Sequence, residues 1–142
     1  MPGTATRPAV TRIVLDTDVV SQYRAGRLPA GHLRLVTASL HCIAFATAGE
    51  LWKGALVKRW GGARSRGLDL WLAREPMLAA SRPVAVTWAA ITAGAQRRGR
   101  PRPLNDSWIA ACCIESGLPL LTLNRRDFAG FAEHDGLVLL DG

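Results

Sequence analysis

Acidic and amide side chains follow several apolar segments of this sequence, in positions where they could bind a cation. In "IVLDTDVVSQ", residues 13–22, Asp16 and Asp18 come directly after an apolar run that is typical of a buried strand. The other members of the set are Glu50, Asp106, Asn124 and Asp127. An ionised carboxylate beside an apolar core is unfavourable unless a cation or hydrogen-bond donors stabilise it. The set therefore indicates metal binding.

The elements that would position these side chains alternate between strands and helices. We expect short strands at 12–16, 41–45, 82–86 and 118–123, and a last one in the tail 136–142. Helices are expected at 17–26, 29–39, 87–99 and 105–117, with a hairpin of two helices at about 47–79. The alternation predicts an α/β fold with a largely parallel central sheet of about five strands, flanked by helices.

The predicted sheet gives the acidic residues a common location. Each of them lies at a strand end or a helix start, and open parallel sheets bind ligands beyond the carboxyl ends of their strands. Converging carboxylates repel one another and stay partly protonated unless a cation shares the site. Oxygen ligands without histidine or cysteine favour Mg²⁺ or Mn²⁺ over zinc.

Helix capping is the competing explanation for the same residues. The segment "TAGE" fits a capping box with Thr47 as the N-cap, and Asp106 or Asp127 could cap the helices that they begin. Capping explains Asp16 less well, because Thr17 or Asp18 could cap the helix that follows the first strand. Capping does not predict an acidic residue after every central strand, whereas a shared cation does.

The composition indicates a globular protein with a basic surface. The chain has 142 residues, of which 49% are hydrophobic and 20% charged, as expected of one domain at 12–142 behind a flexible leader at 1–11. The apolar runs are too short to cross a membrane and the first residues lack the apolar stretch of a secretory signal, so we expect a cytoplasmic location. The three cysteines lack metal-binding spacing and are expected in the core.

The charge points to a polyanionic partner. The formal net charge is +7, and all 18 lysine and arginine residues except Lys53 and Lys58 are arginine, which suits bidentate phosphate contacts. A metal held by carboxylates in a basic protein favours phosphodiester hydrolysis, because the metal lowers the pKa of a bound water and neutralises charge on the phosphate.

Three ordered segments of the chain resemble a known family. They are "IVLDTDVVSQ", "TAGELWKGA" and "RPLNDSWIAACCIESGLPLLTLNRRDF". Together they are similar to the PIN-domain ribonucleases, most closely to the VapC toxins of bacterial type II toxin-antitoxin modules. The resemblance extends from about Arg12 to the C-terminus.

The resemblance implies a Mg²⁺-dependent endoribonuclease that leaves 3′-hydroxyl and 5′-phosphate ends, with Mn²⁺ as a substitute ion. Asp16 and Asp106 would hold the ion. Glu50 would orient the water or complete the metal shell, and Asn124 or Asp127 would do so from the other side. The implied partners are an RNA substrate (tRNA, rRNA or mRNA), a VapB-type antitoxin and a second copy of the chain.

Four arginines come directly before Asp106, in "QRRGRPRPLND". They are Arg97, Arg98, Arg100 and Arg102. These side chains lie within reach of a phosphate backbone that approaches the metal. Alternatively, they form a solvated loop and favour the C-terminus of the preceding helix.

The helical hairpin carries Trp52, Trp60 and Trp71. Tryptophans at such positions usually belong to the core. A groove left open between the two helices would instead suit an amphipathic segment of the antitoxin.

Two other functions use the same acidic residues. The segment "VLDTDVV" also matches the pattern of a haloacid dehalogenase-type phosphatase, although that mechanism needs a suitably placed lysine and a late acidic pair. A non-catalytic PIN-like domain that binds RNA or a partner is the second alternative, because the neutral Asn124 stands where a fourth acidic ligand is common.

Overall fold

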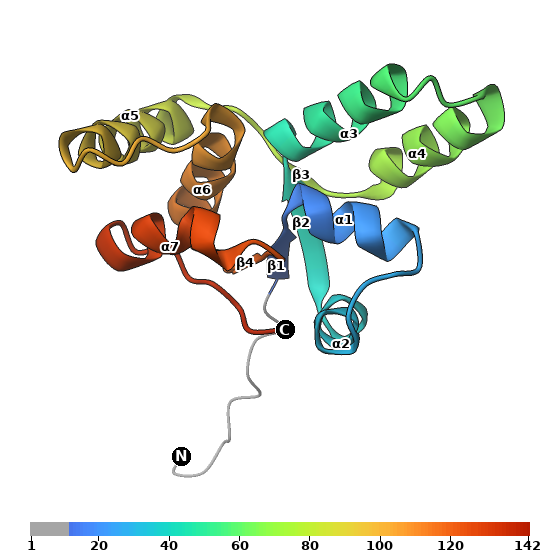
Figure 1. The fold of residues 1–142 in the computed structure, drawn as a ribbon, viewed down its shortest axis with the longest axis horizontal. Coiled ribbons are helices and arrows are strands. Elements are labelled where there is room, and N and C mark those ends of the chain that lie inside the picture. The colour runs from blue at the N-terminus through green and yellow to red at the C-terminus, as the bar shows by residue number, and fades with distance from the viewer. Residues whose placement is uncertain (1–11) are drawn as a thin grey trace, which may run out of the picture.

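Four parallel strands form the centre of this computed structural model, which describes residues 12–142. In chain order they are β1 (Arg12–Leu15), β2 (Leu40–Ala44), β3 (Met77–Leu78) and β4 (Leu120–Leu121). In space their order is β3-β2-β1-β4, so β1 and β2 are the inner strands (Figure 1). The α/β class and the parallel sheet are as predicted, whereas the expected leader lies outside the described residues.

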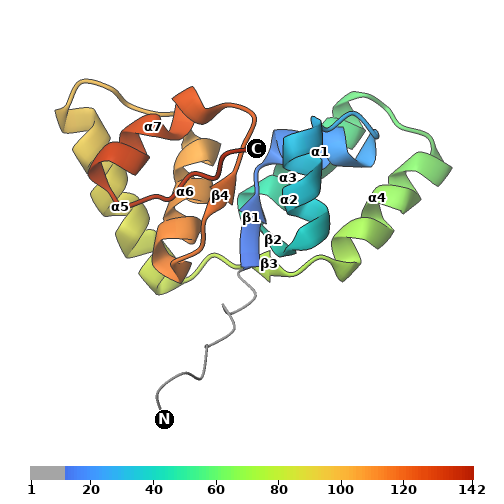
Figure 2. The ribbon, with the colours of Figure 1, turned by 90° about the horizontal axis from the view of Figure 1, so that it is seen from below.

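Helices cover both faces of this sheet (Figures 1 and 2). One face carries α1 (Thr17–Arg24), α2 (Ala30–Ala38), α3 (Phe45–Val57) and α4 (Gly62–Arg74). The other carries α5 (Arg82–Arg97), α6 (Leu104–Ser116) and α7 (Arg125–His134). Parallel strands between two helical layers are apolar on both sides, which explains the short and almost uninterrupted apolar runs of the sequence.

The side chains of β1 alternate between the two faces, as the period of a strand requires. Ile13 and Leu15 pack with α1 to α4, whereas Val14 packs with α5 to α7. Residues Leu120 and Leu121 of β4 divide in the same way. Each fully buried side chain of this kind contributes about 1.5–3 kcal/mol, and together they fix the position at which β1 ends.

The strand predicted at 82–86 is wrong, because this segment begins helix α5. Ser81 is the N-cap, and its Oγ accepts a hydrogen bond of 3.3 Å from the backbone N–H of Val84. Pro83 lies in the first turn, where its missing N–H costs nothing. The third strand is instead Met77–Leu78, which pairs with β2 at the end of the predicted hairpin.

The last predicted strand, in the tail 136–142, is reduced to one isolated bridge between Leu139 and Leu120. The sheet therefore has four strands and not five. The predicted end of α6 at Gly117 is confirmed, and the φ of 67° at this residue is one that glycine adopts without strain. All three cysteines are buried and free.

Candidate active site

Asp16 lies at the carboxyl end of β1, where the chain turns into α1 (Figure 1). The residue is the N-cap of α1, so neither Asp18 nor Thr17 has the predicted capping role. Its Oδ1 accepts from the Thr17 backbone N–H at 2.8 Å, and its Oδ2 accepts from Thr122 Oγ1 at 2.7 Å. The residue is only 5% exposed.

Burial, and after it the nearby charge of Asp18, raise the pKa of Asp16 from 3.8 to about 7. The hydrogen bonds from Thr122 and Thr17 act in the opposite direction but do not compensate. At neutral pH this carboxyl group is therefore partly protonated, and a bound cation would favour its ionised form.

Thr122 connects Asp16 to the segment after β4. Its side chain is fully buried, and its hydroxyl donates to Asp16 Oδ2 while it accepts from the Asn124 backbone N–H at 3.0 Å. A hydroxyl with partners on both sides cannot rotate freely. Thr122 therefore holds the Asp16 carboxylate in one orientation.

Asp18 and Asn124 meet beside Asp16. Asn124 Nδ2 donates to Asp18 Oδ2 at 2.7 Å. Within the described part of the chain, the other oxygen, Asp18 Oδ1, is buried and has no hydrogen-bond partner. A buried carboxylate oxygen without a donor is unfavourable unless a cation or a water binds it.

Glu50 lies inside α3 and accepts at Oε1 from Thr17 Oγ1, at 2.8 Å. The same Thr17 oxygen is 3.1 Å from the hydroxyl oxygen of Thr47, which is fully buried. Helix α3 begins two residues before Thr47, with Ala44 at its N-cap, so the capping box considered for "TAGE" is not formed. Glu50 is thus positioned by a threonine next to Asp16.

Asp106 lies in the first turn of α6 but is not its cap, because the N-cap is Pro103. Burial is the largest of the causes that raise the pKa of Asp106 to about 6, and the charges of Asp127 and Glu50 come next. Arg102 lowers it, and Asp18 adds a smaller increase. Carboxylates from four different helices therefore act on one another at this end of the sheet.

Asp127 lies in the first turn of α7 and forms an ion pair with Arg102, whose Nη2 is 3.2 Å from its Oδ1. Its side chain is 44% exposed, so it lies at the outer side of the acidic group. The N-cap of α7 is Asn124, whose side chain forms no capping bond because it is bound to Asp18.

The donor set fits an open magnesium site. Within residues 12–142, no three acidic, histidine or cysteine side chains are close enough to form a complete metal site by themselves. Mg²⁺ is usually bound by one or two carboxylates and keeps several waters, and so does not need such a cage. Asp16 and Asp106 would supply those carboxylates, and the charge of Asp18, whose Oδ1 has no partner in the described residues, raises the pKa of both.

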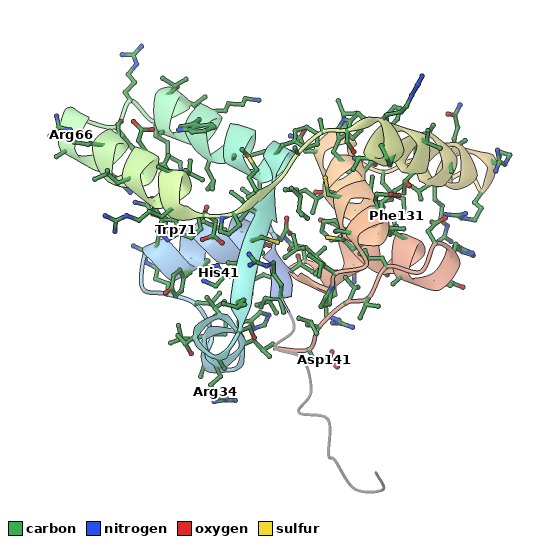
Figure 3. All side chains as sticks on the ribbon, turned by 180° about the vertical axis from the view of Figure 1, so that it is seen from behind. Arg34, His41, Arg66, Trp71, Phe131 and Asp141 are labelled. Atoms are coloured by element: carbon green, nitrogen blue, oxygen red, sulfur yellow. The ribbon has the colours of Figure 1, made fainter. Side chains whose placement is uncertain are left out.

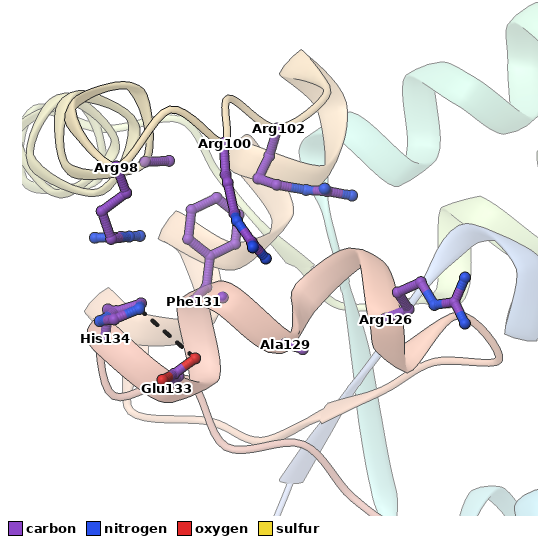
Figure 4. A pocket seen from close by; sticks show the side chains of 10 residues that line it. Arg98, Arg100, Arg102, Arg126, Ala129, Phe131, Glu133 and His134 are labelled. Carbon is purple, nitrogen blue, oxygen red and sulfur yellow. Dashed lines mark ion pairs between the residues drawn. The ribbon is translucent and has the colours of Figure 1, made fainter.

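Three of the predicted RNA-binding arginines share one cavity of about 570 Å³, between the loop after α5 and helix α7 (Figure 4). They are Arg98, Arg100 and Arg102. Arg97 is exposed in the last turn of α5 and does not line this cavity.

A second cavity, of about 540 Å³, lies between α1, α3 and α4 and reaches Thr17 and Glu50. Of the hairpin tryptophans, only Trp60 lines it, with the Arg64 guanidinium 3.9 Å from the ring centre. Trp52 is 44% exposed. Trp71 packs against the core.

The three threonines that support the carboxylates were not predicted from the sequence. Thr122 is the one polar residue in the buried segment "LPLLTL", which was a usable signal. Thr17 and Thr47 carry no comparable signal, because threonine at a helix start is common.

The fold and the acidic edge together define a class of protein: an α/β domain whose carboxylates gather at the carboxyl ends of a parallel sheet. The sequence model of the PIN domain matches residues 13–134. The chain therefore belongs to the PIN domain family, as its sequence motifs indicated. This membership excludes the haloacid dehalogenase-type alternative.

Solved structures share this fold. A chain of VapBC2 from Rickettsia felis, bound to a DNA fragment from their promoter, aligns with a TM-score of 0.75 at 19% identity, over 93% of this chain and 99% of that one. A chain of FitAcB from Neisseria gonorrhoeae aligns with a TM-score of 0.73 at 22% identity, over 91% of this chain and 96% of that one. A chain of DNA-bound VapBC from Salmonella typhimurium aligns with a TM-score of 0.70 at 24% identity, over 92% of this chain and 98% of that one. A search of curated protein sequences finds no match.

Among the described helices, none has both the length and the apolar character needed to span a membrane.

Proposed function

We propose that this protein is a Mg²⁺-dependent endoribonuclease and the toxin of a VapBC-type toxin-antitoxin module. The observation that carries the proposal is the buried Asp16 at the carboxyl end of β1, with a pKa raised to about 7 beside further carboxylates. Membership of the PIN domain family and the likeness to toxin-antitoxin structures support it.

Asp16 and Asp106 would hold the ion. When bound, it would supply a water of lowered pKa and positive charge to balance that of the phosphate. Thr122 keeps Asp16 oriented toward the site. Glu50, fixed by Thr17, would orient the attacking water and accept its proton. From the other side, Asp127 and the Asn124 amide would complete the shell of polar groups.

RNA is the substrate that suits the basic surface. Arg97, Arg98, Arg100 and Arg102 precede Asp106, and Arg102 contacts Asp127 directly. Guanidinium groups bind phosphates in bidentate fashion, so these side chains would hold the RNA backbone on either side of the scissile bond. The proposed substrate is a tRNA, an rRNA or an mRNA, and the proposed location of the protein is the cytoplasm.

An antitoxin segment would bind in the cavity between α1, α3 and α4. Apolar residues of this cavity, among them Leu51 and Leu68, suit an amphipathic helix. The cavity reaches Glu50, so its occupant would block the acidic edge. We also propose a homodimer, since large apolar side chains such as Leu56 and Leu104 remain exposed, at 79% and 61%.

The test is RNA cleavage by the purified chain, free of antitoxin, with Mg²⁺ or with EDTA. The wild type should cut RNA only with Mg²⁺, and Asp16→Asn should not cut it. Cleavage that persists in EDTA or in the variant would end the metal-nuclease proposal. A wild type that binds RNA without cutting it would favour the non-catalytic alternative.

A further inference from the structure

The cavity between the loop after α5 and helix α7 contains several basic side chains, and we call it the arginine cavity. Its arginines are Arg98, Arg100, Arg102 and Arg126, and His134 also lines it (Figure 4). Its wall also includes Phe131, which is 1% exposed and gives the cavity an apolar base. The volume of about 570 Å³ lies within the range of ligand-binding pockets.

The positive charge of this cavity is only partly balanced. The ion pairs are Arg98 with Asp135 at 3.8 Å, and Arg102 with Asp127 at 3.2 Å. Over residues 12–142, neither Arg100 nor Arg126 has an ion-pair partner. Uncompensated guanidinium groups around a concave surface attract an anion.

Basic side chains of this cavity lie at both ends of α7. Arg126 lies at one end of the helix and His134 at the other (Figure 4), which corresponds to about 12 Å at the rise of an α-helix. The acidic residue of the lining, Glu133, is 75% exposed and lies 3.6 Å from His134. An extended anion fits this arrangement better than a single small ion does.

Arg102 joins the arginine cavity to the acidic edge. It lines the cavity, and its Nη2 contacts Asp127, whose charge acts on Asp106. Its Nε is buried and has no hydrogen-bond partner in the described part of the chain. An extended phosphate backbone that passes the acidic edge would therefore continue directly into the arginine cavity.

We propose that the arginine cavity binds backbone phosphates of the RNA that flank the scissile phosphodiester. Arg126 of α7, which the sequence did not suggest, is part of this site together with Arg100, whereas Arg97 does not line the cavity and would contact RNA only outside it. The inference rests on the proposed ribonuclease function. Phosphates are favoured over the carboxylates of an acidic protein segment because the cavity continues from the site that would hold the scissile phosphate.

The experiment measures binding without cleavage. A short fluorescent single-stranded RNA is titrated with the full chain in EDTA, and anisotropy gives Kd over a series of salt concentrations. The test variant is Arg100→Gln/Arg126→Gln. The matched control, Arg34→Gln/Arg66→Gln, removes the same charge from exposed residues of α2 and α4, away from Phe131 (Figure 3).

The test variant should bind RNA roughly tenfold more weakly or worse, because two charge-assisted contacts are lost. Its slope of log Kd against log salt should fall by about 1.4, at about 0.7 per phosphate contact. The control should change Kd by less than about twofold. Equal losses in both variants would overturn the inference, and so would a test variant that loses only affinity for an antitoxin.

Different results would refute the cavity inference and the ribonuclease proposal. If the test variant binds RNA normally while Asp16-dependent cleavage persists, the cavity inference fails and the ribonuclease proposal stands. If the wild type binds RNA through these arginines but never cuts it, the inference stands and the ribonuclease proposal fails.

Discussion

Replacing Asp16 by asparagine should stabilise the metal-free protein at neutral pH, although it removes the proposed metal ligand. Burial and the charge of Asp18 raise the pKa of Asp16 from 3.8 to about 7. The native state thus binds the proton more tightly than the unfolded chain, and the wild type loses stability as the pH rises from about 4 to about 7. A difference of about 3 pH units, at about 1.4 kcal/mol each, gives an upper limit of about 4 kcal/mol.

The assay is urea unfolding in EDTA at about pH 8 and about pH 4.5. The amide carries no ionisation penalty, so Asp16→Asn should exceed the wild type in free energy of unfolding by up to about 4 kcal/mol at the higher pH. This difference should shrink by about 3 kcal/mol at the lower pH, where the native wild-type carboxyl is protonated. Any fixed cost of fitting the amide beside Thr122 is the same at both pH values and cancels.

The control is Asp141→Asn, at a side chain that is 91% exposed. It should match the wild type within about 0.5 kcal/mol at both pH values. If the difference between Asp16→Asn and the wild type did not change with pH, the argument from burial would be refuted.

Three further predictions concern the supports of the site and the fold, each measured by urea unfolding. Thr122→Val leaves Asp16 Oδ2 without its donor and should cost about 1–3 kcal/mol; an unchanged stability would contradict the assigned hydrogen bond. Phe128→Ala removes a ring that is 1% exposed and should cost about 3–5 kcal/mol, whereas a loss below about 1 kcal/mol would disagree with its packing. Ser81→Ala removes the N-cap of α5 and should cost about 1 kcal/mol; an unchanged stability would argue against the observed start of this helix.

The sequence predicted the inner strands and the acidic edge because both depend on local patterns. Uninterrupted apolar runs mark β1 and β2, and polar residues directly after a run mark the strand end, as at Asp16. Asp106 lies in the first turn of α6, the helix that leads into β4, and such a helix begins at the edge where the parallel strands have their carboxyl ends.

The segment 82–86 was misassigned because Val84 and Val86 favour a strand in a short window. The longer pattern is helical, since the buried positions include Val84, Ile91 and Ala95, which lie seven and four residues apart. Tertiary packing of that face on α6, together with the cap at Ser81, decides in favour of the helix.

The hydrogen bonds of the site were beyond sequence reasoning. Thr17 and Glu50 are far apart in the chain and are joined only after α1 and α3 pack together. The contact of Asn124 with Asp18 likewise depends on the angle at which α7 leaves β4. The spacing of residues in the sequence does not determine these packing angles, so the roles of the threonines can be assigned only from the structure.

The central claim is that carboxylates at this edge of the sheet support metal-dependent RNA cleavage. The most direct measurement is the single-turnover rate of cleavage of a labelled RNA, titrated with Mg²⁺, for the wild type, Asp106→Asn and the exposed control Asp141→Asn. The account predicts a rate that rises with Mg²⁺ to saturation in the wild type and the control, and a loss of at least about 100-fold in Asp106→Asn, since even groups outside the metal shell can cost that much. A rate that is independent of Mg²⁺, or equal in Asp106→Asn and the wild type, would contradict it.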